Sequence, residues 1–199
     1  MSMVGSIPAA LSAKVSLEKI TSLNLNEFKE GFKFDDSLSD EWRSIRLKDI
    51  NFNYDHGKFS LNDVNLEIKR GEITFIIGKN GSGKSTLINI LCGLIRPSSG
   101  EIYLDSTKID EANLQSYQAK ISAIFADFYL FSQTLSRDGF ASQSDIEGLL
   151  ALLEIDKKVS VIDNKLSTTQ LSTGQRKRLS LLIAILECRS ILILDEWAA

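Results

Sequence analysis

One stretch, Gly78 to Thr86, constrains this chain more than any other feature of the sequence. It reads GKNGSGKST and matches the spacing G-x-x-x-x-G-K-[ST]. The run before it, Ile73 to Ile77, is rich in β-branched and aromatic residues, which predicts a strand. Residues 85–95 carry apolar side chains at helical spacing, which predicts a helix. Strand, glycine-rich loop and helix in this order predict a binding site for a nucleoside triphosphate.

Each residue type in the stretch has a chemical reason to bind phosphate. Glycines let successive backbone N–H groups converge on one phosphate, and the helix start adds the positive end of its dipole. Lys84 is expected to reach the β and γ phosphates, and the Ser85 hydroxyl to ligate the Mg²⁺ that bridges them. The alternative, a glycine-rich turn before an ordinary helix, would rarely give this pattern by chance. The predicted nucleotide-binding residues are Gly78, Asn80, Gly81, Ser82, Gly83, Lys84, Ser85 and Thr86.

Composition excludes several other classes of protein. The 199 residues are 43% hydrophobic and 25% charged, as in one soluble globular domain. A net charge of −3 disfavours a nucleic acid partner. The longest apolar stretch, Leu179 to Leu194, contains Glu187 and Arg189, so no segment is expected to span a bilayer, and the start does not resemble a signal peptide. Cys92 and Cys188 lack metal-type spacing, and we expect two buried thiols.

The rest of the chain gives a coarse order of elements. The expected elements are a helix at 9–23, a connection at 24–40, a domain boundary near Glu41, an antiparallel strand pair between Ser44 and Lys69 with a turn at Asp55-His56-Gly57, strands at 101–104 and 121–125, and a helix at 145–155. Ser144 and Glu147 have the spacing of a capping box at the start of that last helix.

A second set of residues lies near the end of the chain. Leu171 to Gln175 reads LSTGQ and precedes a long helical pattern, and the apolar run from Ile191 ends in Asp195 and Glu196. Each part alone is weak, because many helices begin with such polar residues and many buried strands end in an acid. Together and in this order they make the chain resemble an ATP-binding cassette (ABC) ATPase domain. GKNGSGKST corresponds to its phosphate loop, LSTGQ to its signature motif and ILILDE to its Walker B strand.

The resemblance implies an α/β fold of the P-loop NTPase class. It consists of an ABC-type, RecA-like core with an antiparallel β subdomain and a helical subdomain that carries the signature motif. Residues 41–199 would form this domain, incomplete at its C-terminus, because the family places one further strand between Ile73–Ile77 and the Walker B strand. That strand, and the switch histidine after it, would follow Ala199. Residues 1–40 would be the cytoplasmic end of a last transmembrane helix and its linker.

The resemblance also implies catalytic roles at the end of Walker B. Asp195 would hold Mg²⁺ through water, and Glu196 would be the general base that orients or deprotonates the attacking water. Lys84 is the other predicted catalytic residue. The alternative for Glu196 is an ordinary surface acid at the end of a strand.

The signature residues Ser172, Thr173, Gly174 and Gln175 would face the γ-phosphate bound to a second cassette. Two such domains would then close head to tail around two ATP molecules. The basic residues that follow, Arg176, Lys177 and Arg178, are interpreted as a solvated helix face. Tyr54 resembles the family's aromatic residue that stacks on adenine, with an ordinary strand tyrosine as the alternative. His56 is interpreted as a turn residue.

Two positions depart from the usual family pattern. Ala126 occupies the place of the Q-loop glutamine, and a methyl group cannot ligate Mg²⁺, which leaves Asp127 as the nearest polar candidate. Trp197-Ala198-Ala199 replaces a common opening of the D-loop. Together with the amino-acid sequence of the signature helix, these features resemble the fused exporters of cyclic peptides, microcins or siderophores.

The leading hypothesis is therefore an ATPase domain that uses ATP and Mg²⁺ to power export at the cytoplasmic face of a bacterial inner membrane. Its expected partners are a second nucleotide-binding domain and a transmembrane domain fused upstream. One alternative is a soluble ABC ATPase acting on nucleic acid or ribosomes. It is disfavoured because the interval between Lys84 and Ser172 is too short for the coiled coil of repair proteins. The other alternative is a non-catalytic nucleotide-binding module, which Glu196 disfavours. The sequence does not identify the transported compound.

Overall fold

The computed structural model divides the chain into two units, residues 1–34 and 35–199. It describes residues 38–54, 59–130, 142–162 and 165–196, all within the second unit. The predicted helix at 9–23, most of the connection at 24–40, the turn at 55–57 and Trp197-Ala198-Ala199 lie outside the described residues.

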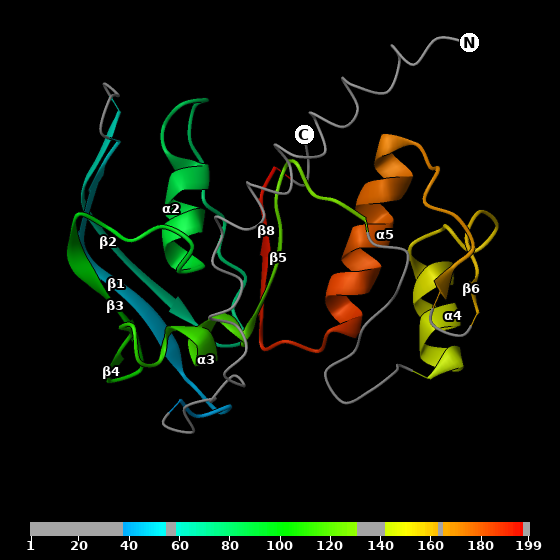
Figure 1. Ribbon diagram of the computed structural model, residues 1–199, viewed down its shortest axis with the longest axis horizontal. Coiled ribbons are helices and arrows are strands. Elements are labelled where there is room, and N and C mark those ends of the chain that lie inside the picture. Colours follow the sequence, from blue (N-terminus) through cyan, green and yellow to red (C-terminus); the bar gives the residue numbers. More distant parts are fainter. Residues whose placement is uncertain (1–37, 55–58, 131–141, 163–164, 197–199) are drawn as a thin grey trace, which may run out of the picture. The chain divides into compact units, whose positions relative to one another are not determined.

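Four antiparallel strands form one sheet in the order β2-β1-β3-β4 (Figure 1). They are β1 (Ser44–Asn53), β2 (Ser60–Lys69), β3 (Ser99–Leu104) and β4 (Thr107–Lys108). Side chains alternate along β1, so that Ile45 and Leu47 are buried while Arg46 between them is exposed. Ile45 pairs with Ile68, and Leu47 pairs with Leu66. The predicted antiparallel pair between Ser44 and Lys69 is confirmed.

Helix α2 (Lys84–Leu91) follows the glycine-rich loop, as predicted, but it ends four residues before the predicted limit of Ile95. The chain turns at Gly93, whose φ is 67°, and Leu94 beyond it is 58% exposed. The buried side of α2 shares one core with the sheet. That core includes Ile45, Leu47, Ile50, Leu87, Ile90, Leu91, Ile102 and Leu104. Helix α3 (Leu114–Gln118) is tied to α2 by the buried Tyr117, whose hydroxyl donates to the Leu91 carbonyl oxygen at 2.7 Å.

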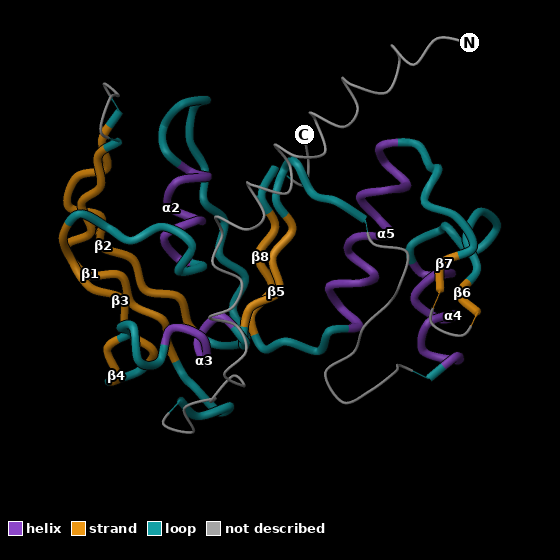
Figure 2. The backbone as a smooth tube through the Cα atoms, viewed as in Figure 1, coloured by secondary structure: helices purple, strands orange, loops and turns teal. Residues whose placement is uncertain are grey.

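Two parallel strands, β5 (Ile121–Ile124) and β8 (Ile191–Leu194), lie side by side in a second sheet (Figure 2). Ile121 pairs with Ile191, and Ile124 pairs with Leu194. Both strands were predicted from short apolar runs, and both are confirmed. Because they are parallel and in register, the residues that follow them, 125–127 and 195–196, leave the sheet at the same edge.

The strand predicted for Ile73–Ile77 is not present in the described structure. These residues are assigned to no helix or strand, and Ile73, Phe75 and Ile77 are 83%, 82% and 90% exposed. Only Ile76 of this run packs partly against the core of the β1 sheet. Strand propensity is insufficient here, because a strand also needs a hydrogen-bonded neighbour and no described strand lies beside the run. Three apolar side chains at alternating positions therefore face solvent.

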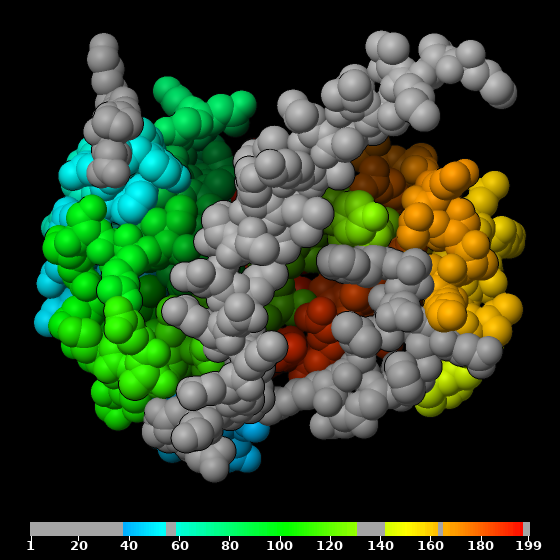
Figure 3. Space-filling view, viewed as in Figure 1, coloured from blue at the N-terminus to red at the C-terminus, as the bar shows by residue number. Residues whose placement is uncertain are grey.

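A helical region forms a second core. It contains α4 (Gln143–Leu152), α5 (Thr173–Leu186) and the short hairpin of β6 (Val161–Ile162) and β7 (Lys165–Leu166). Its buried residues include Ile146, Leu150, Ile155, Val161, Leu179 and Leu182. In the space-filling view the yellow and orange atoms of this region gather together, as do the cyan and green atoms of the sheet and α2 (Figure 3). None of the helices within the described ranges has the length and apolar content needed to cross a bilayer.

The start of α4 corrects one prediction. Ser142, rather than Ser144, is the N-cap, and its side chain accepts a hydrogen bond from the Asp145 amide at 3.2 Å. The helix accordingly begins at Gln143, and it ends at Leu152 rather than at residue 155. The chain here offers serines at two neighbouring positions, and the one with an extended backbone becomes the cap.

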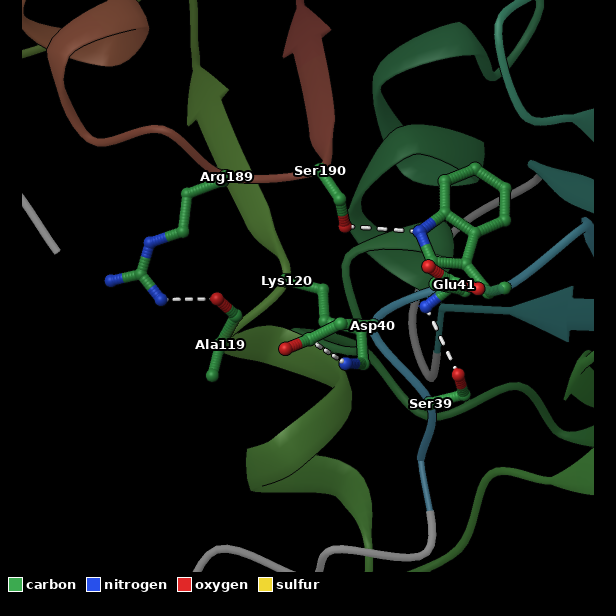
Figure 4. Close-up of polar contacts among 8 residues, drawn as sticks. Ser39, Asp40, Glu41, Ala119, Lys120, Arg189 and Ser190 are labelled. Carbon is green, nitrogen blue, oxygen red and sulfur yellow. Dashed lines mark hydrogen bonds and ion pairs between the residues drawn. The ribbon is translucent and has the colours of Figure 1, made fainter.

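The segment before β1 is attached to the starts of β5 and β8 (Figure 4). Asp40 pairs with the buried Lys120 at 2.7 Å, and the Trp42 indole N–H donates to the Ser190 hydroxyl oxygen at 3.0 Å. The Arg189 guanidinium also donates to the Ala119 carbonyl oxygen. Leu38 and Trp42 are both buried in the core of the β1 sheet. This segment and two distant strand starts are therefore held together by one polar cluster.

Candidate nucleotide-binding site

The glycine-rich loop has a conformation that suits an anion. Gly81 and Gly83 have φ values of 78° and 94°, and the Ser82 amide donates to the Lys79 carbonyl oxygen at 3.1 Å. Gly83 is the N-cap of α2 and provides no side chain to cap it. The N–H groups of the first turn are therefore not occupied by a capping side chain, and they lie at the positive end of the helix.

Lys84 folds back over this loop. Its ammonium group donates to the Gly78 carbonyl oxygen at 3.0 Å and to the Lys79 carbonyl oxygen at 3.1 Å. The positive charge therefore lies against the loop whose residues are predicted to bind a phosphate. The remaining loop residues, Asn80, Gly81, Ser82 and Ser85, are exposed.

Tyr54 lies beside the first turn of α2. Its hydroxyl is 3.3 Å from the Thr86 hydroxyl, and its ring makes an edge contact with Phe52 at a centroid distance of 4.8 Å. Tyr54 is 46% exposed, whereas Thr86 is buried. An aromatic ring therefore stands next to the loop with much of its surface open, an arrangement in which a flat base could stack.

The acidic pair lies at the end of β8. Asp195 is 7% exposed, and its amide donates to the Ile124 carbonyl oxygen of β5 at 2.8 Å. Glu196 is exposed, and its backbone has a φ of 51°. Burial, and then the negative charge of Asp195, raise the pKa of the Cys92 thiol to about 11.

The cysteines correct a further prediction. Cys92 is buried, as expected, but Cys188 is exposed and has a φ of 50°. It lies in the turn between α5 and β8, where the chain has left the helix. The apolar character of the flanking sequence gave no indication of this turn.

The loop after β5 lies at the same sheet edge as the acidic pair. Ala126 and Asp127 are both exposed, and they lie in a turn that is closed by a hydrogen bond from the Phe128 amide to the Phe125 carbonyl oxygen at 3.2 Å. The structure therefore brings the predicted Q-loop positions and the predicted Walker B acids to one edge. Asp127 therefore adds a third carboxylate to this edge, besides those of Asp195 and Glu196.

The signature residues form the start of α5. The Ser172 hydroxyl oxygen accepts from the Gln175 amide at 3.4 Å, and the Ser172 amide donates to the Gln175 side-chain oxygen at 3.1 Å. This reciprocal capping box confirms the predicted N-cap. Thr173 and Gly174 are exposed, and a methyl group at Gly174 would meet no atom within 4 Å. The first turn of α5 is therefore exposed in the part of the chain that the structure describes.

The basic residues after the signature motif differ from the prediction of a purely solvated face. Lys177 is half-buried and donates to the Glu196 carbonyl oxygen at 3.1 Å. The Arg176 guanidinium lies 5.8 Å from the centroid of the Phe128 ring. Arg178 is exposed and bonds Glu154 and the Leu153 carbonyl oxygen. Sequence reasoning missed these contacts, because helical spacing alone does not show which segments α5 packs against.

The donor set fits a magnesium ion that arrives with a nucleotide. Among the described residues, no group of three or more His, Cys, Asp or Glu side chains could hold a metal. Mg²⁺ that binds with phosphates needs none, because one or two carboxylates, a hydroxyl, phosphate oxygens and water complete its shell. Asp195 offers a buried carboxylate and Ser85 an exposed hydroxyl, which are two of the oxygen types that suit such a shell.

Some predicted site residues stay apart. Within the described ranges, the glycine-rich loop shares no hydrogen bond with the acidic pair or with the signature motif. The signature helix packs in the helical core, while α2 packs in the core of the β1 sheet.

Comparisons with known proteins show the family to which this chain belongs. The family model for the ABC transporter matches residues 61–199. The chain is 39% identical over 165 residues to the ATP-binding protein SyrD of Pseudomonas syringae pv. syringae, covering 79% of this chain and 29% of that protein. It is 34% identical over 197 residues to the mating factor M secretion protein mam1 of Schizosaccharomyces pombe, covering 93% of this chain and 14% of that protein.

A solved structure of a bacterial Atm1-family ABC exporter with ATP bound has the same fold. It matches with a TM-score of 0.69 and 22% identity, over 94% of this chain and 35% of that chain. The chain thus spans less than a third of the length of SyrD and about a third of that exporter chain. The phosphate loop, the acidic strand end, the capped signature helix and these matches lead to one conclusion: the chain belongs to the ABC transporter family and forms an ATP-binding domain of that family.

Proposed function

We propose that this chain hydrolyses ATP to power the export of a peptide-like substrate across a bacterial inner membrane, working at its cytoplasmic face. The observation that carries the catalytic part is the shared edge of β5 and β8, where Asp195 is buried and Glu196 is exposed beside it. The secretion named for mam1 supports outward transport. The peptide-like substrate is inferred from Ala126, from the amino-acid sequence of the signature helix and from Trp197-Ala198-Ala199 after the acidic pair. Together these features resemble the exporters of cyclic peptides, microcins or siderophores.

Each residue has a part in this reaction. The first-turn N–H groups of α2 and the Lys84 ammonium bind the β and γ phosphates, and the ring of Tyr54 stacks on the adenine. The Glu196 carboxylate accepts a proton from the water that attacks the γ-phosphorus. Mg²⁺, held by the Ser85 hydroxyl and through water by Asp195, would neutralise charge on the phosphates. Asp127, at the same sheet edge, is the first alternative for the base.

The proposal includes two protein partners. A second cassette places its open α5 start, with Ser172, Thr173 and Gly174, against the γ-phosphate, because an anion binds favourably at a helix N-terminus. A transmembrane domain fused upstream uses the resulting closure to move the substrate. Residues 1–40 would form the connection to that domain.

The experiment compares Glu196→Gln with Lys84→Ala in the full gene product that carries this sequence. Glu196→Gln should keep ATP binding, measured by calorimetry, and should nearly abolish phosphate release, because an amide has the shape of the carboxylate but cannot act as a base. It should also accumulate as an ATP-bound dimer. Lys84→Ala should lose ATP binding itself.

Two results would contradict the proposal. Undiminished hydrolysis by Glu196→Gln would move the base to another residue, with Asp127 as the first alternative. Equal ATP affinity in Lys84→Ala and the unchanged protein would overturn the phosphate site. A protein that binds ATP without turnover before any substitution would be a non-catalytic module.

A further inference from the structure

A contact between α5 and the end of β8 joins two parts of the catalytic machinery. Lys177 lies in the second turn of the helix that begins with the signature motif, and its ammonium donates to the backbone carbonyl oxygen of Glu196 at 3.1 Å. The two residues are distant in sequence. The contact therefore depends on how α5 is seated beside the sheet that carries the acidic pair.

The backbone of Glu196 needs such support. Its φ of 51° lies in the left-handed region, which costs a non-glycine residue about 1–2 kcal/mol. The strand no longer fixes the chain at this point, since β8 ends at Leu194 and the last ladder bond runs from the Asp195 amide to Ile124. The Lys177 bond restrains the peptide that follows the Glu196 α-carbon. Rotation about the N–Cα bond of Glu196 moves its carbonyl group and its Cβ together, so a bond that holds the carbonyl also restrains the direction in which the side chain leaves the backbone.

A second basic residue of α5, Arg176, contacts the loop that follows β5. Arg176 lies over the ring of Phe128, which follows Ala126 and Asp127 at the same sheet edge. Consecutive residues of one helix thus contact the loop after β5 and the residue at the end of β8. Arg178, the next cation, contacts Leu153 and Glu154 at the end of α4. Only the first two reach the catalytic edge.

We propose that Lys177 is a positioning residue that sets the direction of the Glu196 carboxylate through the backbone of that residue. The inference rests on the proposed role of Glu196 as the base. It adds that the placement of the base depends on α5, the helix whose first turn would contact the partner's ATP. A shift of α5 would therefore change the alignment of the base in its own site.

The test measures kcat and KM for ATP in the full gene product. Lys177→Met should lower kcat by about 10- to 100-fold, the effect of misplacing a reacting group by about 1 Å, and should leave KM within about twofold. Lys177→Arg, which keeps a donor of similar reach, should recover most of the rate. Arg178→Met is the matched control and should leave kcat within about twofold of the unchanged protein. If Lys177→Met does not fold, Lys177→Gln takes its place in the test. Its side chain is too short to reach the Glu196 carbonyl oxygen, and it still favours a helix.

A double variant separates positioning from general damage. If Lys177 acts through the base, Lys177→Met should cause no further loss in a protein that already carries Glu196→Gln. The ATP-induced rise in melting temperature should also be equal in Glu196→Gln with and without Lys177→Met. A further fall in rate, an equal loss in Arg178→Met, an unchanged kcat in Lys177→Met or no recovery in Lys177→Arg would overturn the inference. Full turnover in Glu196→Gln alone would instead overturn the proposed function.

Discussion

At the scale of single residues, Gly83 shows how closely the loop is packed on the sheet. A methyl group placed on its α-carbon would lie 2.4 Å from a ring carbon of Phe59 and 2.7 Å from a methyl carbon of Leu61. Its φ of 94° is also a value that other residues rarely adopt. Gly81 has a similar φ of 78°, but a methyl group there would meet nothing within 4 Å.

These two glycines form a matched pair for a stability experiment. Gly83→Ala should lower the free energy of unfolding by more than Gly81→Ala, because it adds a steric clash to a backbone cost of about 1–3 kcal/mol that both share. Urea unfolding of the two variants measures the difference. Equal losses in the free energy of unfolding would show that Phe59 and Leu61 move aside for the added methyl group without destabilising the protein.

The two cysteines should differ in reactivity. The buried Cys92 thiol has a pKa raised to about 11, so its thiolate is scarce at pH 8, whereas Cys188 is exposed. A thiol reagent such as DTNB should modify one cysteine of the native protein at pH 8 and both in denaturant. Cys188→Ser should remove the fast reaction. Fast labelling that persists in this variant would contradict the burial of Cys92.

At the scale of elements, helix starts show what local sequence can and cannot decide. The N-cap of α5 was readable, because Ser172 stands just before a long helical pattern, and the structure adds the reciprocal bonds of a capping box with Gln175. At α4 the same rule selected Ser144, while the structure uses Ser142. The extended backbone at Ser142 makes that residue the cap, and local spacing does not show which serine has this backbone.

The α4 cap can be tested with two serines of the same segment. Ser142→Ala should lower the free energy of unfolding by about 1 kcal/mol, since the Asp145 amide loses its side-chain acceptor and keeps only the Ser142 carbonyl oxygen. Ser144→Ala leaves that bond in place and should have a smaller effect. Thermal unfolding followed by circular dichroism measures both. A larger loss in Ser144→Ala would restore the original prediction.

At the scale of the whole described unit, the polar cluster around Lys120 connects distant segments. The Lys120 side chain is 7% exposed and pairs with Asp40, whose side chain is 64% exposed. A buried ammonium without its partner is unfavourable, because it has lost water without gaining another charge. This pair therefore makes the segment before β1 part of the same folding unit as β5.

Removing the partner should destabilise the unit. Asp40→Asn is expected to lower the free energy of unfolding by about 1–3 kcal/mol, a range below that of fully buried pairs because Asp40 is largely exposed. Glu41→Gln, an exposed neighbouring acid, is the control and should have little effect. Adding Lys120→Met to Asp40→Asn should restore part of the loss, because the unpaired charge is then gone. If Asp40→Asn, Glu41→Gln and the Asp40→Asn, Lys120→Met double variant have equal stability in urea, the role of this pair is contradicted.

The sequence by itself determined the family, the glycine-rich loop, the antiparallel pair, the strands β5 and β8 and the capped signature helix. These features depend on residues close together in the chain, where spacing and residue type directly limit the backbone.

Tertiary structure alone decided that Ile73–Ile77 forms no strand, that Cys188 is exposed and that Lys177 reaches the Glu196 carbonyl. Strand pairing and the Lys177 contact depend on segments distant in sequence, and the exposure of Cys188 depends on where the chain turns after α5. Strand pairing, burial and side-chain contacts require two surfaces to meet, and local sequence describes only one of them.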